Sequence, residues 1–174
     1  MTLYADLPIH DVPHTQPRAD AAEGLVITGL VAHPRLLRTA DILVLPRVKW
    51  AAPFRCEEGW VVPSVEWQGF RVTDVLALSG LAPSAQYVRV CAGTYVIVLS
   101  LCEASAALLC DRLNGQPLSH EHGAPWRLVV PGGVCFTSVK WVQRLEVTAA
   151  PGDSSGERIA RARLSQLQQN IPST

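Results

Sequence analysis

Cys56 lies in the segment Phe54-Arg-Cys-Glu-Glu-Gly-Trp60, where a strand-like run meets a loop rich in polar groups. A cysteine attacks electrophiles and binds metals as the thiolate, and the neighbouring guanidinium of Arg55 favours that form. The carboxylates of Glu57 and Glu58 oppose it. These residues alone leave two interpretations open, a reactive or metal-binding thiol and a buried structural thiol. Burial is the ordinary fate of a free cysteine.

Three potential metal ligands stand together in His120-Glu121-His122. Two histidines at positions i and i+2 point the same way only on a strand, and Pro117 and Pro125 argue against a strand here. A catalytic zinc site also needs a third ligand and hydrogen-bonded groups behind the ligands. The alternatives are a zinc site and a solvated polar loop, and the sequence favours the loop.

Two basic residues stand in apolar surroundings: Arg127 lies inside the strand-like run Trp126–Val130, and Lys140 lies between Val139 and Trp141. A basic side chain in such a place either extends to solvent or meets an anion. We expect the two residues in neighbouring strands near a glycine-rich turn, where together they could hold a phosphate. The alternative is that both side chains run to solvent at the strand ends.

The composition describes the kind of chain that must position these residues. Of its 174 residues, 48% are hydrophobic and 17% charged, which excludes a disordered protein. Fifteen basic and fifteen acidic residues give no net charge, so the chain is not expected to bind nucleic acid through bulk electrostatics. The lack of net charge also leaves little repulsion against forming a homo-oligomer.

The sequence shows no sign of a membrane or secretory route. No apolar run approaches the ~20 residues that a membrane span requires. The N-terminus has no basic region, no twin arginine and no apolar stretch, so a cytoplasmic location is expected. The five cysteines are odd in number and form no C-x-x-C pair, so most of them are expected to be buried small hydrophobic residues.

Hydrophobic patterning predicts a mixed α+β domain of several small sheets with short helices around them. Residues 1–23 are expected to form an extended N-terminal arm, residues 24–149 the domain, and residues 150–174 a linker followed by an exposed helical tail. Strands are predicted at Leu25–Val31, Arg47–Cys56, Val65–Trp67, Gln86–Cys91, Thr94–Leu99, Trp126–Val130 and Val139–Val147.

Helix signals stand between these strands. Short helices are predicted after the capping residues Thr39 and Thr73, and a third helix is predicted to run from a capping box at Ser100 and Glu103 to Leu109. Gln116–Pro125 is expected to be a loop, and Glu157–Gln169 a further helix.

The order of several segments resembles the sulfite oxidase family, more narrowly the molybdopterin-binding domain of its short, single-domain bacterial members. The resemblance covers about residues 24–148. It rests on Cys56-x-x-Gly-Trp60, Trp67-x-Gly69, Asn114-Gly-x-Pro-Leu118, Glu121-His-Gly-x-Pro-x-Arg-Leu-Val-Val-Pro131 and Ser138-Val-Lys-Trp141, of which the last two are the most specific.

The resemblance implies a mixed α+β fold built around one molybdopterin cofactor. It implies that the Cys56 thiolate is the protein ligand of molybdenum, which suits a soft metal site whose pterin supplies two more sulfurs. It also implies a set of residues that bind the pterin and its phosphate: His122, Arg127, Ser138, Val139 and Lys140. From the N-terminal arm it implies His10, with His14 as a rival.

The departures from the family pattern concern the substrate. Relatives that oxidise sulfite place arginines just after the cysteine, whereas this chain has the acidic segment Glu57-Glu-Gly-Trp-Val61. Gly93 stands where the family usually has an aspartate that contacts the cofactor, and Asp111 stands where an aromatic residue is common. The resemblance does not extend to the dimerisation and haem domains of classical sulfite oxidases, so neither is expected in these 174 residues. Cofactor binding therefore transfers better than sulfite specificity.

The expected function is that of a molybdenum–molybdopterin oxidoreductase that transfers an oxygen atom to or from a small oxyanion, S-oxide or N-oxide. The cofactor performs this chemistry while the protein holds it and shapes the pocket. Arg55 is expected to orient an anionic substrate, and an external haem or flavin protein to exchange electrons. The alternative is a non-catalytic member that keeps the fold and binds the cofactor or another ligand.

Overall fold

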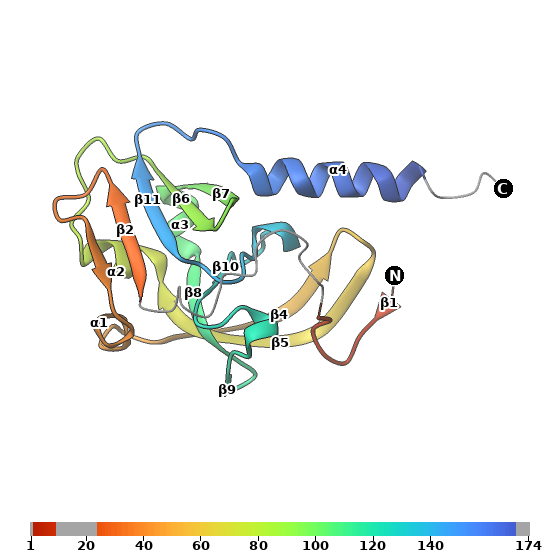
Figure 1. Cartoon of the computed structure of the whole chain (residues 1–174). Coiled ribbons are helices and arrows are strands. Elements are labelled where there is room, and N and C mark those ends of the chain that lie inside the picture. The colour runs from red at the N-terminus through yellow and green to blue at the C-terminus, as the bar shows by residue number, and fades with distance from the viewer. Residues whose placement is uncertain (1, 10–23, 170–174) are drawn as a thin grey trace.

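The computed structural model describes residues 2–9 and 24–169, and the strands of these residues form two sheets (Figure 1). The strands of the larger sheet are β1 (Thr2–Leu3), β4 (Val48–Cys56), β5 (Trp60–Arg71), β8 (Leu108–Leu113), β9 (Gln116–Pro117) and β10 (Arg127–Val129). Those of the smaller sheet are β2 (Leu25–Gly29), β3 (Arg35–Leu37), β6 (Tyr87–Ala92), β7 (Tyr95–Ser100) and β11 (Arg144–Thr148).

The larger sheet is organised around the long strand β5. β4 pairs with it antiparallel along most of its length, from Val48↔Gly69 to Cys56↔Trp60, so the two strands form a hairpin that ends at Cys56. On its other edge β5 pairs with β1 and with β8, and β8 in turn pairs with β10 and β9. This order places the end of β4 and the start of β10 in one sheet.

The smaller sheet has the strand order β3-β2-β11-β6-β7. β2 and β11 pair in parallel, although they are the first and the last strands of the domain body. β6 and β7 form the predicted hairpin, with Ala92 opposite Tyr95. The loop that leads into β11 carries Ser138 and Lys140, so the parallel pair fixes where that loop leaves the sheet.

Short helices complete the domain: α1 (Thr39–Leu43), α2 (Val72–Ala77), α3 (Leu101–Ala106), α4 (Ser155–Gln169) and the 3-10 helices η2 (His120–His122) and η3 (Cys135–Thr137). The main core contains fully buried side chains of the smaller sheet, such as Ile27 and Leu145, together with Val75 of α2 and Trp126. A second core cluster, around Trp67, lies on the larger sheet beneath the cavity described below. The mixed α+β architecture predicted from the sequence is confirmed.

Several local predictions are confirmed, and others are corrected by pairing between distant segments. The Ser100 hydroxyl accepts a hydrogen bond from the backbone N–H of Glu103 (3.2 Å), and the Glu103 carboxylate accepts one from the Ser100 N–H (2.8 Å), as the capping box predicts. However, helix α3 ends at Ala106, and Leu108 and Leu109 belong to β8 rather than to the helix. These leucines are buried because β8 pairs with both β5 and β10, which favours the strand.

Other corrections concern element lengths. β5 runs from Trp60 to Arg71 and is far longer than the predicted strand Val65–Trp67. Arg38 and Arg71, and not the predicted threonines, occupy the N-cap positions of α1 and α2, and neither arginine makes a side-chain capping hydrogen bond. In contrast, the last strand is shorter than the predicted strand Val139–Val147, because β11 begins only at Arg144.

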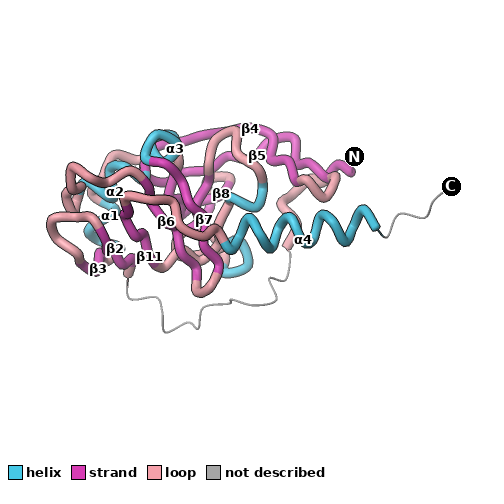
Figure 2. The backbone as a smooth tube through the Cα atoms, turned by 90° about the horizontal axis from the view of Figure 1, so that it is seen from above, coloured by secondary structure: helices cyan, strands magenta, loops and turns pink. Residues whose placement is uncertain are grey.

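Helix α4 is not the free tail that its composition predicts. In both views it begins beside β7 and runs toward the side of the molecule where β1 lies (Figures 1 and 2). Ser155 anchors its start, because its hydroxyl accepts a hydrogen bond from Val96 N–H (2.9 Å) and donates one to Thr94 O (2.7 Å). Within the described residues, no helix is both long enough and apolar enough to cross a bilayer.

Candidate functional site

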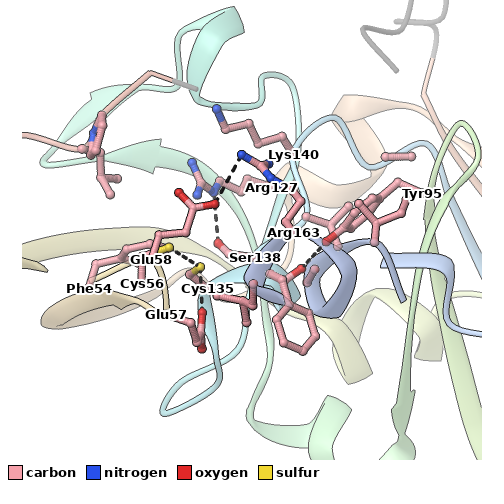
Figure 3. A pocket seen from close by; sticks show the side chains of 18 of the residues that line it. Phe54, Cys56, Glu57, Glu58, Tyr95, Arg127, Cys135, Ser138, Lys140 and Arg163 are labelled. Atoms are coloured by element: carbon pink, nitrogen blue, oxygen red, sulfur yellow. Dashed lines mark hydrogen bonds and ion pairs between the residues drawn. The ribbon is translucent and has the colours of Figure 1, made fainter. Parts of the chain in front are cut away.

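A cavity of about 480 Å³ lies between the end of β4, the loop from η3 to β11, and α4. Ligand pockets typically have volumes of roughly 300–1,000 Å³. Figure 3 shows side chains from all three segments pointing into it. Its lining residues fall within the ranges 7–8, 54–60, 92–95, 127, 135–141 and 159–164. Residues that are far apart in the sequence therefore meet at one site.

Cys56 reaches the cavity because of the alternation of β4. Phe54 and Cys56 are half-buried and line the cavity, whereas Arg55 between them is exposed. Arg55 instead lines a second, smaller cavity of about 210 Å³. Successive side chains of a strand point to opposite faces of the sheet, so the structure does not bring Arg55 into the site where the sequence-based interpretation expected it.

The sulfur of Cys135, at the start of η3, lies 2.7 Å from the sulfur of Cys56 (Figure 3). Cys135 also donates a hydrogen bond to Glu57 Oε2 (2.9 Å), so its single S–H proton faces two acceptors. The hydrogen bond from Cys135 holds the pKa of Cys56 below its ordinary value, while the same bond, together with burial, raises the pKa of Cys135. Cys56 is therefore the thiol that ionises first, which a metal ligand requires.

Arg127 is the charged residue most deeply enclosed at the site, with 6% of its surface exposed. Its Nε donates a hydrogen bond to Ser138 Oγ and its Nη1 donates one to the carbonyl oxygen of His122, both at 3.1 Å. Its guanidinium carbon also lies 4.8 Å from the ring centre of Trp67. Burial lowers the pKa of Arg127 to about 10, so the side chain remains charged at pH 7.

Arg127 has no carboxylate partner among the ion pairs of the described residues. A buried charge is costly unless an opposite charge or hydrogen bonds compensate it. The hydrogen-bond acceptors and the tryptophan ring around Arg127 hold the guanidinium in place but do not neutralise it. The residue is therefore suited to an anion that enters the cavity, and a phosphate matches its planar donor geometry.

The loop between η3 and β11 supplies the rest of the predicted binding set. Ser138, Val139 and Lys140 all line the cavity. Ser138 Oγ accepts from Arg127 and donates to Leu128 O (3.1 Å), and Lys140 Nζ donates to Glu121 O (2.6 Å). Lys140 thus lies on a loop and not on a strand neighbouring that of Arg127, which corrects the sequence-based placement while keeping both cations at one cavity.

Gly123 explains why this loop fits against the His120–His122 helix. Its φ is +107°, and a Cβ at Gly123 would lie 2.9 Å from the Cα of Lys140. Only glycine combines that conformation with such a close approach. The glycine of the His-Gly-x-Pro-x-Arg segment therefore lets the backbone of Lys140 pack directly against this segment.

His122 lies beside the cavity and outside its lining. Its carbonyl oxygen orients Arg127, and its imidazole makes a backbone hydrogen bond to Leu7 of the N-terminal segment. Burial lowers the pKa of His122, and so do the positive charges of Arg127 and Lys140. Leu7 and Pro8 line the cavity, whereas His10 and His14 lie outside the described residues.

The alternative of a zinc site at His120-Glu121-His122 is not supported. These residues form η2, and His120 and Glu121 are exposed. Among the described residues, the potential metal ligands that approach within 4.8 Å of one another are Cys56, Glu57 and Cys135. The polar loop was the better interpretation of the histidine pair.

Helix α4 supplies one wall of the cavity, which sequence reasoning missed. Ile159, Ala160, Arg163 and Leu164 line the cavity from this helix. Arg163 Nη2 lies 3.3 Å from Glu58 Oε1, and the two side chains are 52% and 27% exposed. A cation is therefore present near the acidic loop, supplied by the part of the chain predicted to be an exposed tail.

Comparison with known protein families identifies the chain. The family described as oxidoreductase molybdopterin binding domain matches residues 11–155. The chain belongs to this family. As a sulfite oxidase family member it is an oxidoreductase whose cofactor is Mo-molybdopterin, as the sequence motifs predicted.

Relatives of this molybdopterin-binding domain include a sulfite oxidase and a sulfane dehydrogenase. The "Uncharacterized oxidoreductase YuiH" of Bacillus subtilis is 33% identical over 150 residues, which are 84% of this chain and 75% of YuiH. A sulfite oxidase of Arabidopsis thaliana is 30% identical over 180 residues, 82% of this chain but only 44% of that protein. The structure of the sulfane dehydrogenase SoxCD from Paracoccus pantotrophus superimposes with a TM-score of 0.70 at 26% identity, over 77% of this chain and 40% of that chain.

The cavity meets the chemical needs of the molybdopterin cofactor. The buried, uncompensated guanidinium of Arg127 and the ammonium of Lys140 suit its phosphate. The Cys56 thiol, on the other side of the same cavity, is of the soft ligand type that molybdenum accepts. The residues present therefore fit the group that this family binds.

Proposed function

We propose that the chain is a molybdopterin-dependent oxidoreductase that transfers an oxygen atom to or from a small substrate within the 480 Å³ cavity. The observation that carries this proposal is the burial of Arg127 in a cavity that Cys56 also lines. When bound, Mo-molybdopterin supplies two-electron chemistry at its metal. The chain itself has to bind this group, orient it and admit the substrate.

In this proposal the two sides of the cavity have different tasks. Arg127 and Lys140 hold the phosphate, and Ser138 and Val139, which line the same cavity, lie against the rest of the pterin. Cys56 supplies the thiolate ligand. His122 positions the guanidinium through its carbonyl oxygen, 3.1 Å from Arg127 Nη1. Arg55 has no part in this arrangement, and His10 remains a predicted contributor from the N-terminal arm.

The substrate side combines acidic, basic and apolar groups. Glu58 pairs with Arg163, Glu57 accepts a hydrogen bond from Cys135, and Ile159 and Leu164 add apolar surface. A dianion such as sulfite is costly to desolvate unless several cations converge on it. We therefore propose a neutral or weakly charged S-oxide or N-oxide as the preferred substrate, and a separate haem or flavin protein as the electron partner.

The test is to purify the protein from a host that makes Mo-molybdopterin and to measure molybdenum by elemental analysis and pterin by fluorescence. The loaded protein is then assayed with S-oxides, N-oxides and sulfite, using an artificial electron carrier. The proposal expects one molybdenum with one pterin, and faster turnover with S-oxides or N-oxides than with sulfite. Protein without molybdenum or pterin would overturn it.

A loaded protein that turns over none of these substrates would instead favour the non-catalytic alternative. Two features support this alternative. One is the acidic loop that follows Cys56, and the other is Gly93, which stands where the family resemblance leads one to expect a carboxylate.

A further inference from the structure

Two cysteines that are 79 residues apart in the sequence meet in the cavity (Figure 3). The distance between the sulfurs of Cys56 and Cys135 is 2.7 Å, and a disulfide bond measures about 2.05 Å. Both residues are half-buried and both line the cavity. Small molecules that enter the cavity can therefore reach both sulfurs.

Local hydrogen bonds hold each of the two cysteines in place. After Cys56 the chain turns back at once, with Gly59 N–H donating to Cys56 O (3.0 Å). Cys135 begins η3, and its carbonyl oxygen accepts from Ser138 N–H (3.0 Å). Because both segments are anchored, the approach of the two sulfurs is a property of the folded chain and not of one flexible side chain.

Cys135 is not part of the phosphate and pterin contacts proposed above, and it is not needed to fill the core, since it is only half-buried. Its side chain contacts the proposed ligand Cys56 and the carboxylate of Glu57. Cys135 is therefore placed to react with one other thiol, that of Cys56, on which molybdenum binding is proposed to depend.

We propose that Cys56 and Cys135 form a reversible disulfide in the cofactor-free protein, and that this bond closes the site to molybdenum. The two thiols give up two protons and two electrons as the S–S bond forms. A low-molecular-weight disulfide accepts them and is split into two thiols, by exchange through a mixed disulfide. The reverse exchange with excess thiol restores both cysteines.

The prediction that the disulfide blocks cofactor loading rests on the proposed role of Cys56 as the molybdenum ligand. The prediction that the disulfide forms does not depend on that role. A sulfur bonded to Cys135 is no longer a thiolate and cannot bind the metal. Conversely, a bound cofactor that occupies the Cys56 sulfur leaves Cys135 without its partner. Loaded protein should therefore resist the oxidation that cofactor-free protein undergoes.

The first experiment uses the full chain made in a host that lacks molybdopterin. The reduced protein is treated with oxidised glutathione and its intact mass is measured, followed by peptide mapping without reduction. The expected result is a mass lower by two hydrogens and a crosslinked peptide pair containing Cys56 and Cys135. Cys135→Ser and Cys135→Ala should not lose this mass, and Cys102→Ser, which changes an exposed cysteine, should still lose it.

The second experiment incubates reduced and oxidised protein with Mo-molybdopterin and measures bound molybdenum and pterin. Oxidised wild-type protein should bind no molybdenum until dithiothreitol is added, while Cys135→Ser should load equally after either treatment. A crosslink between other cysteines, or only glutathione adducts, would overturn the inference without affecting the proposed function. Disulfide formation with unchanged loading, together with molybdenum retained by Cys56→Ser, would instead overturn the proposed role of Cys56.

Discussion

The two sides of the cavity carry similar charges in very different settings. On the inner side, Arg127 is 6% exposed and has no carboxylate partner among the described residues. On the side of α4, the Arg163 side chain is 52% exposed and pairs with Glu58. A buried charge without an opposite charge nearby favours an anion that stays bound, whereas an exposed pair can open and close at little cost. The inner side is thus built for a resident group and the outer side for an exchangeable one.

The largest effect is expected at the inner side. Arg127→Ala should yield mostly cofactor-free protein with less pterin and molybdenum, because loss of one partner of a buried charge pair typically costs about 3–5 kcal/mol. Elemental analysis and pterin fluorescence of the purified protein measure this. Arg158→Ala on α4, whose side chain is 69% exposed, is the matched control and should load normally. Full loading of Arg127→Ala would show that this arginine is not an anchor.

A second substitution separates the metal from the pterin. Cys56→Ser should abolish turnover yet retain much of the pterin, because the proposed phosphate contacts lie on the loop and strand across the cavity. Turnover assays and pterin fluorescence on the same preparation check both halves of this expectation. Cys102→Ser should behave as wild type. If a cysteine other than Cys56 proved essential for turnover, the proposed ligand would be wrong.

Smaller effects are expected at the outer side, in opposite directions. Glu58→Gln should free Arg163 and strengthen the binding of sulfite, whereas Arg163→Ala should weaken it. Because the ion pair is partly exposed, we expect each substitution to change the free energy of sulfite binding by about 0.2–1 kcal/mol. This corresponds to a change of up to about fivefold in the Michaelis constant. Steady-state kinetics with sulfite and with a neutral S-oxide distinguish an effect on substrate charge from an effect on the shape of the cavity. Equal changes for both substrates would argue against a role in selecting charge.

The weakest expected effect is a dependence of stability on pH at the edge of the inner side. The pKa of His122 is lowered in the folded protein by burial and by Arg127 and Lys140. As the pH falls below about 6.5, the unfolded chain takes up a proton first, so stability is lost. Thermal unfolding of cofactor-free protein between pH 7.5 and 5.5, values chosen to bracket that ordinary histidine pKa, should show this fall in wild type and a smaller one in His122→Gln.

The control for this measurement is His120→Gln, since His120 is exposed in the same 3-10 helix. It should keep the wild-type slope. An identical slope in His122→Gln would mean that other groups cause the acid sensitivity.

The parts of the molecule that were predictable are those set by neighbours in the sequence. The capping box at Ser100 and the β6–β7 hairpin depend on short-range hydrogen bonds and were predicted correctly. The position of Arg55 was also within reach, since a residue next to Cys56 on a strand must face the other way. Strand β8 could not be predicted in this way, because Leu108 and Leu109 suit a helix or a strand equally. Only their pairing with β5 and β10 determines that they form a strand.

The parts of the site that the sequence did not predict also depend on contacts between distant segments. Arg163 and Cys135 reach the cavity only through tertiary packing, and neither carries a local signal of its role. Gly156 illustrates this packing, because a Cβ there would lie 2.6 Å from the ring of Tyr95. The close contact of α4 with β7 that sets the position of Arg163 is thus invisible until the fold is known.

The parallel pairing of β2 with β11 has a consequence for biosynthesis. The smaller sheet cannot close until its last strand, which follows the binding loop of Ser138 and Lys140, has left the ribosome. Contacts between such distant segments form slowly, because the loop entropy must be overcome first. The inner side of the cavity is therefore completed only after β11 has been translated. Stable insertion of the cofactor is expected after that point, and a shorter nascent chain would gain little stability from its presence.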